Sequence, residues 1–246
     1  MRNIRLVIEF DGSRYDGWQK QARKGSNTVQ DKIEAVLEKM EGKPVELIGA
    51  GRTEAGVHAY AQVANFKTDS KLKMYEIKHY LNRYLPMDIA VTEIELMQER
   101  FHASLNAESK IYLYRLSIAE VPSVFERKYV YHAFKKPDVD LMKQAALLMV
   151  GKHDFKNFST VKKSKSTVKE VYDIDIYDDG NEIQFTIHAN DFLHNMARMM
   201  IGTLIDIGLG NRKKEDVEKL LLGDNKVAAS APADPKGLFL QEVVYK

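Results

Sequence analysis

The chain has 246 residues, enough for one large domain or two smaller ones that each bury a hydrophobic core. Hydrophobic residues make up 44% and charged residues 29%, which excludes a disordered, collagen-like or low-complexity chain. The 37 basic and 35 acidic residues give a formal net charge of +2. The chain contains no cysteine, which excludes disulfides, thiolate nucleophiles and cysteine-ligated metals.

The apolar stretches are short. Uncharged segments such as 144–151 and 199–205 fall far below the ~18 apolar residues that a membrane helix needs, so we expect no membrane span. The N-terminal segment MRNIRLVIEF lacks the apolar core and the small-residue cleavage site of a signal peptide. We therefore expect a cytoplasmic protein.

The first third of the chain predicts a strand, a helix and two further strands. Residues 3–10 alternate between apolar and polar side chains, which is typical of a half-buried strand. Thr28 then precedes a helix with apolar side chains at 3.6-residue spacing, which ends before Gly42. A short strand is expected at 45–48 and a longer one at 58–67.

A similar order returns later in the chain. The pattern predicts strands at 111–118, 171–177, 182–189 and 238–245, and helices at 139–150, 192–207 and 214–222. Two passes through these elements predict an α+β fold of two related halves, each a helix-backed antiparallel sheet of the ferredoxin-like type. The boundary is expected near 104–109, giving halves of 1–104 and 105–246.

The segment Gly49-Ala-Gly-Arg-Thr-Glu-Ala-Gly56 is the first candidate site. It does not fit a dinucleotide-binding motif, because Glu54 stands where the third glycine would fall, and it lacks the Gly-Lys-Ser/Thr ending of a P-loop. Its glycines permit a tight or closely approached loop that carries Arg52 and Glu54. From these residues alone, a catalytic loop and a plain surface turn are equally open.

Arg198 stands within the apolar pattern of the predicted helix 192–207. A guanidinium among methionines and isoleucines is costly unless a carboxylate pairs with it, and Glu54 is a natural candidate. The alternatives are that Arg198 reaches solvent or pairs with Asp191 or Asp206 nearby in the sequence.

Three further features each have a functional and a structural interpretation. Tyr112 and Tyr114 share one face of a strand, where aromatic rings either stack on unpaired bases or pack a core. Six lysines at 152–169, including Lys162 and Lys163, either follow an RNA backbone or belong to a solvated loop. The segment alone favours the solvated loop. The spacing of His188, Asp191 and His194 across a strand-to-helix junction favours a structural role over a metal site.

Seven blocks of the sequence together resemble the TruA family of tRNA pseudouridine synthases, although none is specific alone. They cover nearly the whole chain in order: FDGSRYDGWQxQ from Phe10, Val29-Gln30, GAGRTEAGVHA from Gly49 with Gln62-Val63, Phe101-His-Ala103, Tyr112-x-Tyr114, FxHxMxRxxxG from Phe192, and Ala231-Pro-Ala233 before Gly237-Leu-Phe-Leu240.

The resemblance implies an isomerase without cofactor or metal, working as a homodimer that holds tRNA across a central catalytic cleft between the halves. Members of the family convert uridine to pseudouridine in the anticodon stem-loop, at tRNA positions 38–40. By position, Glu54 is the nucleophile, Arg198 is its charge partner and Tyr112 stacks on the uracil. Leu240, with Leu238 as the alternative, contacts the base. Arg52 helps to hold the flipped nucleotide or its phosphates, and the charge pattern adds Lys162 and Lys163 as RNA contacts.

The sequence departs from the family at one position, because the family has aspartate where this chain has Glu54. Glutamate keeps the charge and a similar solution pKa, ~4.3 against ~3.9, but its extra methylene moves the carboxylate. The first hypothesis is therefore an active tRNA-uridine isomerase, and the alternative is a tRNA-binding or tRNA-folding paralogue with impaired catalysis. A generic single-strand RNA module fits least, because the aromatic signature of such modules is absent.

Overall fold

A computed structural model describes residues 1–23, 25–160, 166–224 and 227–246. The chain forms two compact units: unit 1 contains Met1–Glu108 and Leu240–Lys246, and unit 2 contains Ser109–Phe239. The sequence predicts a boundary at 104–109 with all later residues in the second half. In the structure, residues 240–246 belong to unit 1, because strand β10 (Leu238–Tyr245) pairs with β3 of that unit.

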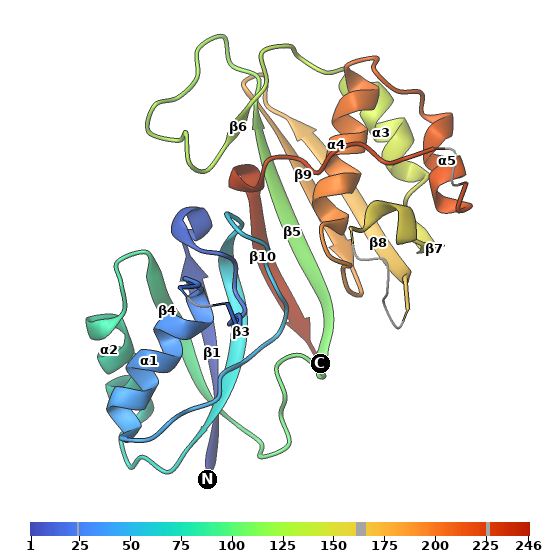
Figure 1. Ribbon diagram of the computed structural model, residues 1–246. Coiled ribbons are helices and arrows are strands. Elements are labelled where there is room, and N and C mark those ends of the chain that lie inside the picture. Colours follow the sequence, from blue (N-terminus) through green and yellow to red (C-terminus); the bar gives the residue numbers. More distant parts are fainter. Residues whose placement is uncertain (24, 161–165, 225–226) are drawn as a thin grey trace. The chain divides into compact units, whose positions relative to one another are not determined.

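Unit 1 is a sheet with two helices on one face (Figure 1). Its strand order is β4-β1-β3-β10, with β1 (Arg2–Phe10) antiparallel to both β3 (His58–Thr68) and β4 (Ile89–Met97), and β2 (Ile48–Gly49) paired to β3. The covering helices are α1 (Val29–Glu41) and α2 (Met74–Tyr84). The alternate β1 side chains Ile4, Leu6, Ile8 and Phe10 are buried, as the period-2 pattern predicts.

Unit 2 contains a comparable set of strands and helices. The strand order is β5-β9-β8-β7, formed by β5 (Ala107–Ser117), β9 (Glu182–Ala189), β8 (Val168–Asp178) and β7 (Gly151–Asp154). A short strand, β6 (Tyr131–His132), pairs with β5 in parallel, unlike the antiparallel pairs that the sequence predicts. The helices are α3 (Val139–Leu147), α4 (Met196–Gly208) and α5 (Glu215–Leu221), and α3 packs against α4 and β8 (Figure 1).

The predicted α+β class is confirmed, with local differences. The local sequence pattern predicts no element for residues 74–97, where α2 and β4 lie. It also starts the helix of Arg198 at 192, whereas α4 begins at Met196 because Asn195 has φ 61°, a left-handed conformation that a right-handed helix cannot include. Within the described residues, no helix is long and apolar enough to cross a membrane.

Candidate active site

The loop that carries Glu54 is held by backbone hydrogen bonds on both sides. Trp18 N donates to Thr53 O at 3.1 Å and Gly56 N donates to Tyr15 O at 3.3 Å, so the segment before α1 supports the loop. Val57 N closes the loop itself with a bond of 3.1 Å to Glu54 O. Glu54 is half-buried in this setting. Its backbone is therefore fixed while its carboxylate remains partly accessible.

Two glycines allow the supporting segment to approach the Glu54 loop closely. A Cβ on Gly12 would lie 1.9 Å from the carbonyl oxygen of Val57, and a Cβ on Gly17 would lie 2.5 Å from that of Thr53. Gly17 also has φ +100°, a conformation that favours glycine. The loop and its support thus meet backbone to backbone, with no room for a side chain at either glycine.

A buried tyrosine anchors the supporting segment to the start of β4. The hydroxyl of Tyr15 donates to Asp88 Oδ1 at 2.6 Å, and Arg14 Nη2 donates to Asp88 Oδ2 at 2.6 Å. Burial and the bond to Asp88 raise the pKa of Tyr15 well above its ordinary value. Burial raises the pKa of Asp88, but the bonds from Tyr15 and Arg14 outweigh it and the pKa falls below its ordinary value. Asp88 is therefore an ionised anchor for the segment that supports the Glu54 loop.

Arg198 lies in the first turn of α4 in unit 2 and is half-buried. Its Nε donates to Ala233 O at 2.7 Å and its Nη1 donates to Asn195 Oδ1 at 3.0 Å. Asp191, one of its predicted partners, instead accepts bonds of 2.6 Å from both Lys110 and Lys169. The guanidinium is thus oriented by neighbours on its own unit.

Tyr112 and Tyr114 are both buried. Tyr112 is 5% exposed, and its ring meets Phe192 edge-on with centroids 4.9 Å apart. Tyr114 is fully buried, and its hydroxyl has no hydrogen-bond partner in the described structure. The ring of Tyr112 is therefore held by packing, which suits either interpretation of this strand.

The predicted site residues are divided between the units. Glu54, Arg52 and Leu240 belong to unit 1, whereas Tyr112 and Arg198 belong to unit 2. Arg52 is exposed and Leu240 is fully buried. The pairing of Glu54 with Arg198 stays a prediction. Lys162 and Lys163 lie outside the described residues.

His188, Asp191 and His194, for which the sequence favours a structural role over a metal site, each have a partner in the protein. His188 Nε2 lies 2.8 Å from Ser109 Oγ, and His194 Nδ1 lies 2.6 Å from Thr160 Oγ1. Asp191 holds the two lysine ammonium groups described above. All three therefore take part in local bonding networks of unit 2.

Sequence reasoning missed Asn195, Tyr15 and Asp88. Asparagine tolerates the left-handed conformation better than most residues, so Asn195 offered a weak signal for a helix start. The contact of Tyr15 with Asp88 joins residues 73 positions apart, and no local pattern indicates it.

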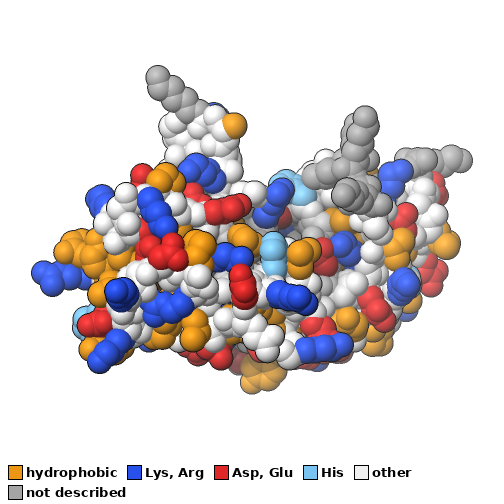
Figure 2. Space-filling model, turned by 90° about the horizontal axis from the view of Figure 1, so that it is seen from below, with side chains coloured by type: hydrophobic (Ala, Val, Ile, Leu, Met, Phe, Trp, Pro, Cys, Tyr) orange, Lys and Arg blue, Asp and Glu red, His pale blue; other side chains and the backbone are white. Residues whose placement is uncertain are grey.

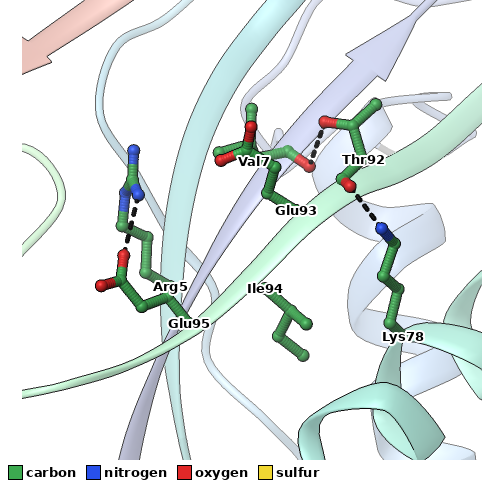
Figure 3. A pocket seen from close by; sticks show the side chains of 7 residues that line it. All are labelled: Arg5, Val7, Lys78, Thr92, Glu93, Ile94 and Glu95. Carbon is green, nitrogen blue, oxygen red and sulfur yellow. Dashed lines mark hydrogen bonds and ion pairs between the residues drawn. The ribbon is translucent and has the colours of Figure 1, made fainter.

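Two cavities of unit 1 contain none of the predicted site residues. One, of about 380 Å³, lies beside β1, β4 and α2, where Arg5 Nη1 pairs with Glu95 at 3.1 Å and Thr92 Oγ1 donates to Val7 O at 3.2 Å (Figure 3). The other, of about 930 Å³, is lined by the segment around Phe101 and by the C-terminal strand. On the face shown in Figure 2, basic and acidic side chains are interspersed instead of separated by sign.

The comparisons with known proteins agree on one family. A family model described as tRNA pseudouridine synthase matches residues 6–104 and 145–246. "tRNA pseudouridine synthase A 2" of Bacillus anthracis is 44% identical over 246 residues, with all of both chains covered. "tRNA pseudouridine synthase A" of Bacillus sp. (strain KSM-64) and "tRNA pseudouridine synthase A 1" of Clostridium tetani are 44% and 43% identical over the same full length.

Among solved structures, a chain from "Crystal Structure of a Cbf5-Nop10-Gar1 Complex" aligns over 82% of this chain and 54% of its own. Its TM-score of 0.32 and 10% sequence identity are too low to add to the assignment. The family assignment rests on the full-length sequence matches. The chain belongs to the TruA family of tRNA pseudouridine synthases, a family of isomerases.

Proposed function

We propose that this chain isomerises uridine to pseudouridine in the anticodon stem-loop of tRNA, with Glu54 as the nucleophile. The observation that carries the proposal is the Glu54 loop, where hydrogen bonds on both sides fix the backbone of a half-buried acidic residue. Family membership over the full length supports the substrate class. Arg198 balances the charge of the carboxylate, and Tyr112 stacks on the uracil.

The reaction needs a carboxylate because charge develops at the sugar. The bond from ribose C1′ to uracil N1 breaks, the base turns, and a new bond joins C5 to C1′. The proton leaves C5, and N1 gains one, so the product is an isomer of the substrate and no water is consumed. A carboxylate at C1′ can stabilise the developing positive charge or form a covalent intermediate, as in retaining glycosidases.

The target nucleotide must leave its stack before the carboxylate can reach its sugar. Arg52 is exposed beside Glu54 in the sequence and is proposed to hold the flipped nucleotide or its phosphate. Leu240 is proposed to contact the base, and Lys162 and Lys163 to contact the RNA backbone. Because such contacts release counterions from RNA, tRNA binding should weaken steeply with salt.

The test is to map pseudouridine in an unmodified tRNA transcript after incubation with the chain, with Glu54→Asp and with Glu54→Gln. Product from the unchanged chain and none from Glu54→Gln supports the proposal. Product from Glu54→Asp alone supports the alternative, a tRNA-binding paralogue with impaired catalysis. The observation that favours this alternative is glutamate in place of the family's aspartate, because a displacement of ~1 Å can lower a rate about a hundredfold.

We also propose that the chain forms a homodimer in the cytoplasm, where it meets its tRNA substrate. The segment 119–137 of unit 2 exposes large apolar side chains, which favours a protein partner over solvent. Val121 is 73% exposed, Val124 68%, Phe125 91% and Phe134 94%. Sedimentation equilibrium should give twice the chain mass at micromolar concentration, and a monomer at every concentration would contradict the dimer.

A further inference from the structure

The turn before α4 contains an unusual backbone conformation next to Arg198. Asn195 has φ 61° and ψ 6°, and it is the one non-glycine residue with a positive φ in the part of the chain that the structure describes. A left-handed residue costs free energy unless it is glycine, and such positions cluster at functional sites. Asn195 is also the residue that precedes the first turn of the helix carrying Arg198.

The side-chain amide of Asn195 bonds on two sides. Its Oδ1 accepts from Arg198 Nη1 at 3.0 Å. Its Nδ2 lies 3.1 Å from Thr160 Oγ1 and 3.1 Å from His194 Nδ1. A guanidinium has donors only, so the amide oxygen must face Arg198 and the amide nitrogen must face Thr160 and His194. The orientation of the amide is therefore determined by its neighbours.

Two acceptors then define the direction of the Arg198 guanidinium. Ala233 O binds Nε at 2.7 Å, and Asn195 Oδ1 binds Nη1 at 3.0 Å. The backbone around Ala233 is itself tied to the helix, because Ala233 N donates to Arg198 O at 2.9 Å. With two separate nitrogens held, rotation of the guanidinium about its long side chain is restricted.

From these contacts we propose that Asn195 is a positioning residue, which orients the Arg198 guanidinium through its side-chain amide. Glycine would adopt the same backbone conformation at lower cost. The amide is what asparagine adds at this position, and its oxygen binds Arg198. The proposal rests on the proposed function, in which Arg198 balances the charge of Glu54 during the reaction.

The decisive variant is Asn195→Gly, because glycine keeps the left-handed backbone and removes only the amide. We expect an unchanged or higher melting temperature, a KM for tRNA within about threefold, and a kcat lowered about 10- to 100-fold, as for other small misplacements of reacting groups. Asn211→Gly is the matched control, because Asn211 follows the same helix and its side chain makes a long bond of 3.4 Å to Asp206. It should keep the kcat of the unchanged chain.

A second variant tests the other side of the amide. Thr160→Val removes the hydroxyl 3.1 Å from Asn195 Nδ2 and leaves the oxygen facing Arg198. A smaller fall in kcat, about threefold, is expected. Full kcat in Asn195→Gly would overturn the proposal, because asparagine would then serve the backbone alone.

A readout without turnover separates this proposal from the proposed function. The Nη–H groups of Arg198, assigned in ¹H–¹⁵N spectra by their loss in Arg198→Lys, should be protected from exchange in the unchanged chain and less protected in Asn195→Gly, because Asn195 Oδ1 accepts from Nη1. Equal protection in both would refute the positioning role. Reduced protection with no pseudouridine from the unchanged chain would uphold the positioning role and refute the proposed function.

Discussion

Gly12→Ala tests whether the support behind the Glu54 loop sets its position. The added Cβ would lie 1.9 Å from Val57 O and 2.6 Å from Val57 C, where real Cβ contacts stay above 3.0 Å. Both atoms belong to backbone, so the two segments must separate by about 1 Å. Val57 N bonds to Glu54 O at 3.1 Å, so the displacement reaches the residue that carries the carboxylate.

A displacement of ~1 Å predicts a single-turnover rate lowered about a hundredfold, and the overpacking predicts a loss of about 1–3 kcal/mol in unfolding free energy. The assay is the single-turnover rate of pseudouridine formation at saturating enzyme, with urea unfolding measured in parallel. Gly42→Ala is the control, because its Cβ meets nothing within 4 Å and its φ of +70° costs only stability, about 1 kcal/mol. A rate for Gly12→Ala equal to that of Gly42→Ala would refute the reasoning.

Three other substitutions test separate contacts. Tyr15→Phe removes the hydroxyl bonded to the Asp88 carboxylate and should lower the unfolding free energy by about 1.5–3 kcal/mol, measured by urea titration; an unchanged midpoint would contradict the anchor. Burial raises the pKa of Asp191, but its two lysine partners outweigh this and lower it. Its stabilisation is thus complete above the unfolded value of about 3.9 and is lost as pH falls through the lower folded pKa. Asp191→Asn should accordingly flatten the acid limb of stability against pH, and an identical limb would speak against the ion pairs. Arg198→Lys loses the Nε bond to Ala233 and should lower kcat at least tenfold with tRNA binding retained, as filter binding would show; equal kcat would exclude a role in the reaction.

The fold class follows from local patterns in the sequence. Alternation in residues 3–10 and the spacing after Thr28 predict β1 and α1, and the structure has both. Gly42 ends α1 in the left-handed conformation that such a glycine indicates. These elements are predictable because their burial pattern depends on neighbours within a few residues.

Other features depend on contacts that are distant in the sequence. β4 has a register shift opposite β1 between Val7 and Ile8, which breaks the simple alternation in residues 89–97. Residues 240–246 belong to unit 1 because β10 pairs with β3, and the local sequence pattern does not specify this pairing. The start of α4 coincides with Asn195, whose amide contacts include Thr160, 35 positions away in the sequence.

The candidate site is predicted from the sequence only in part. The glycines of the Glu54 loop indicate a closely approached turn, and the structure shows the approach at Gly12 and Gly17. The predicted role of Glu54 depends on the resemblance to a family. The residues alone do not indicate it, because an Arg-Thr-Glu turn is also common on protein surfaces. The bond from Arg198 to Asn195 is not predictable from the sequence, because the helical pattern alone extends the helix through Asn195.

The carboxylate of Glu54 is the centre of this account, and its removal at constant shape tests it most directly. Rapid-quench single turnover on a transcript with one anticodon-arm uridine would compare the unchanged chain with Glu54→Gln, after filter binding shows equal affinity for the RNA. We predict conversion of that uridine by the unchanged chain and a rate at least about a thousandfold lower for Glu54→Gln, in line with the loss of a nucleophile. Conversion at similar rates by both proteins would contradict the claim that this carboxylate performs the chemistry.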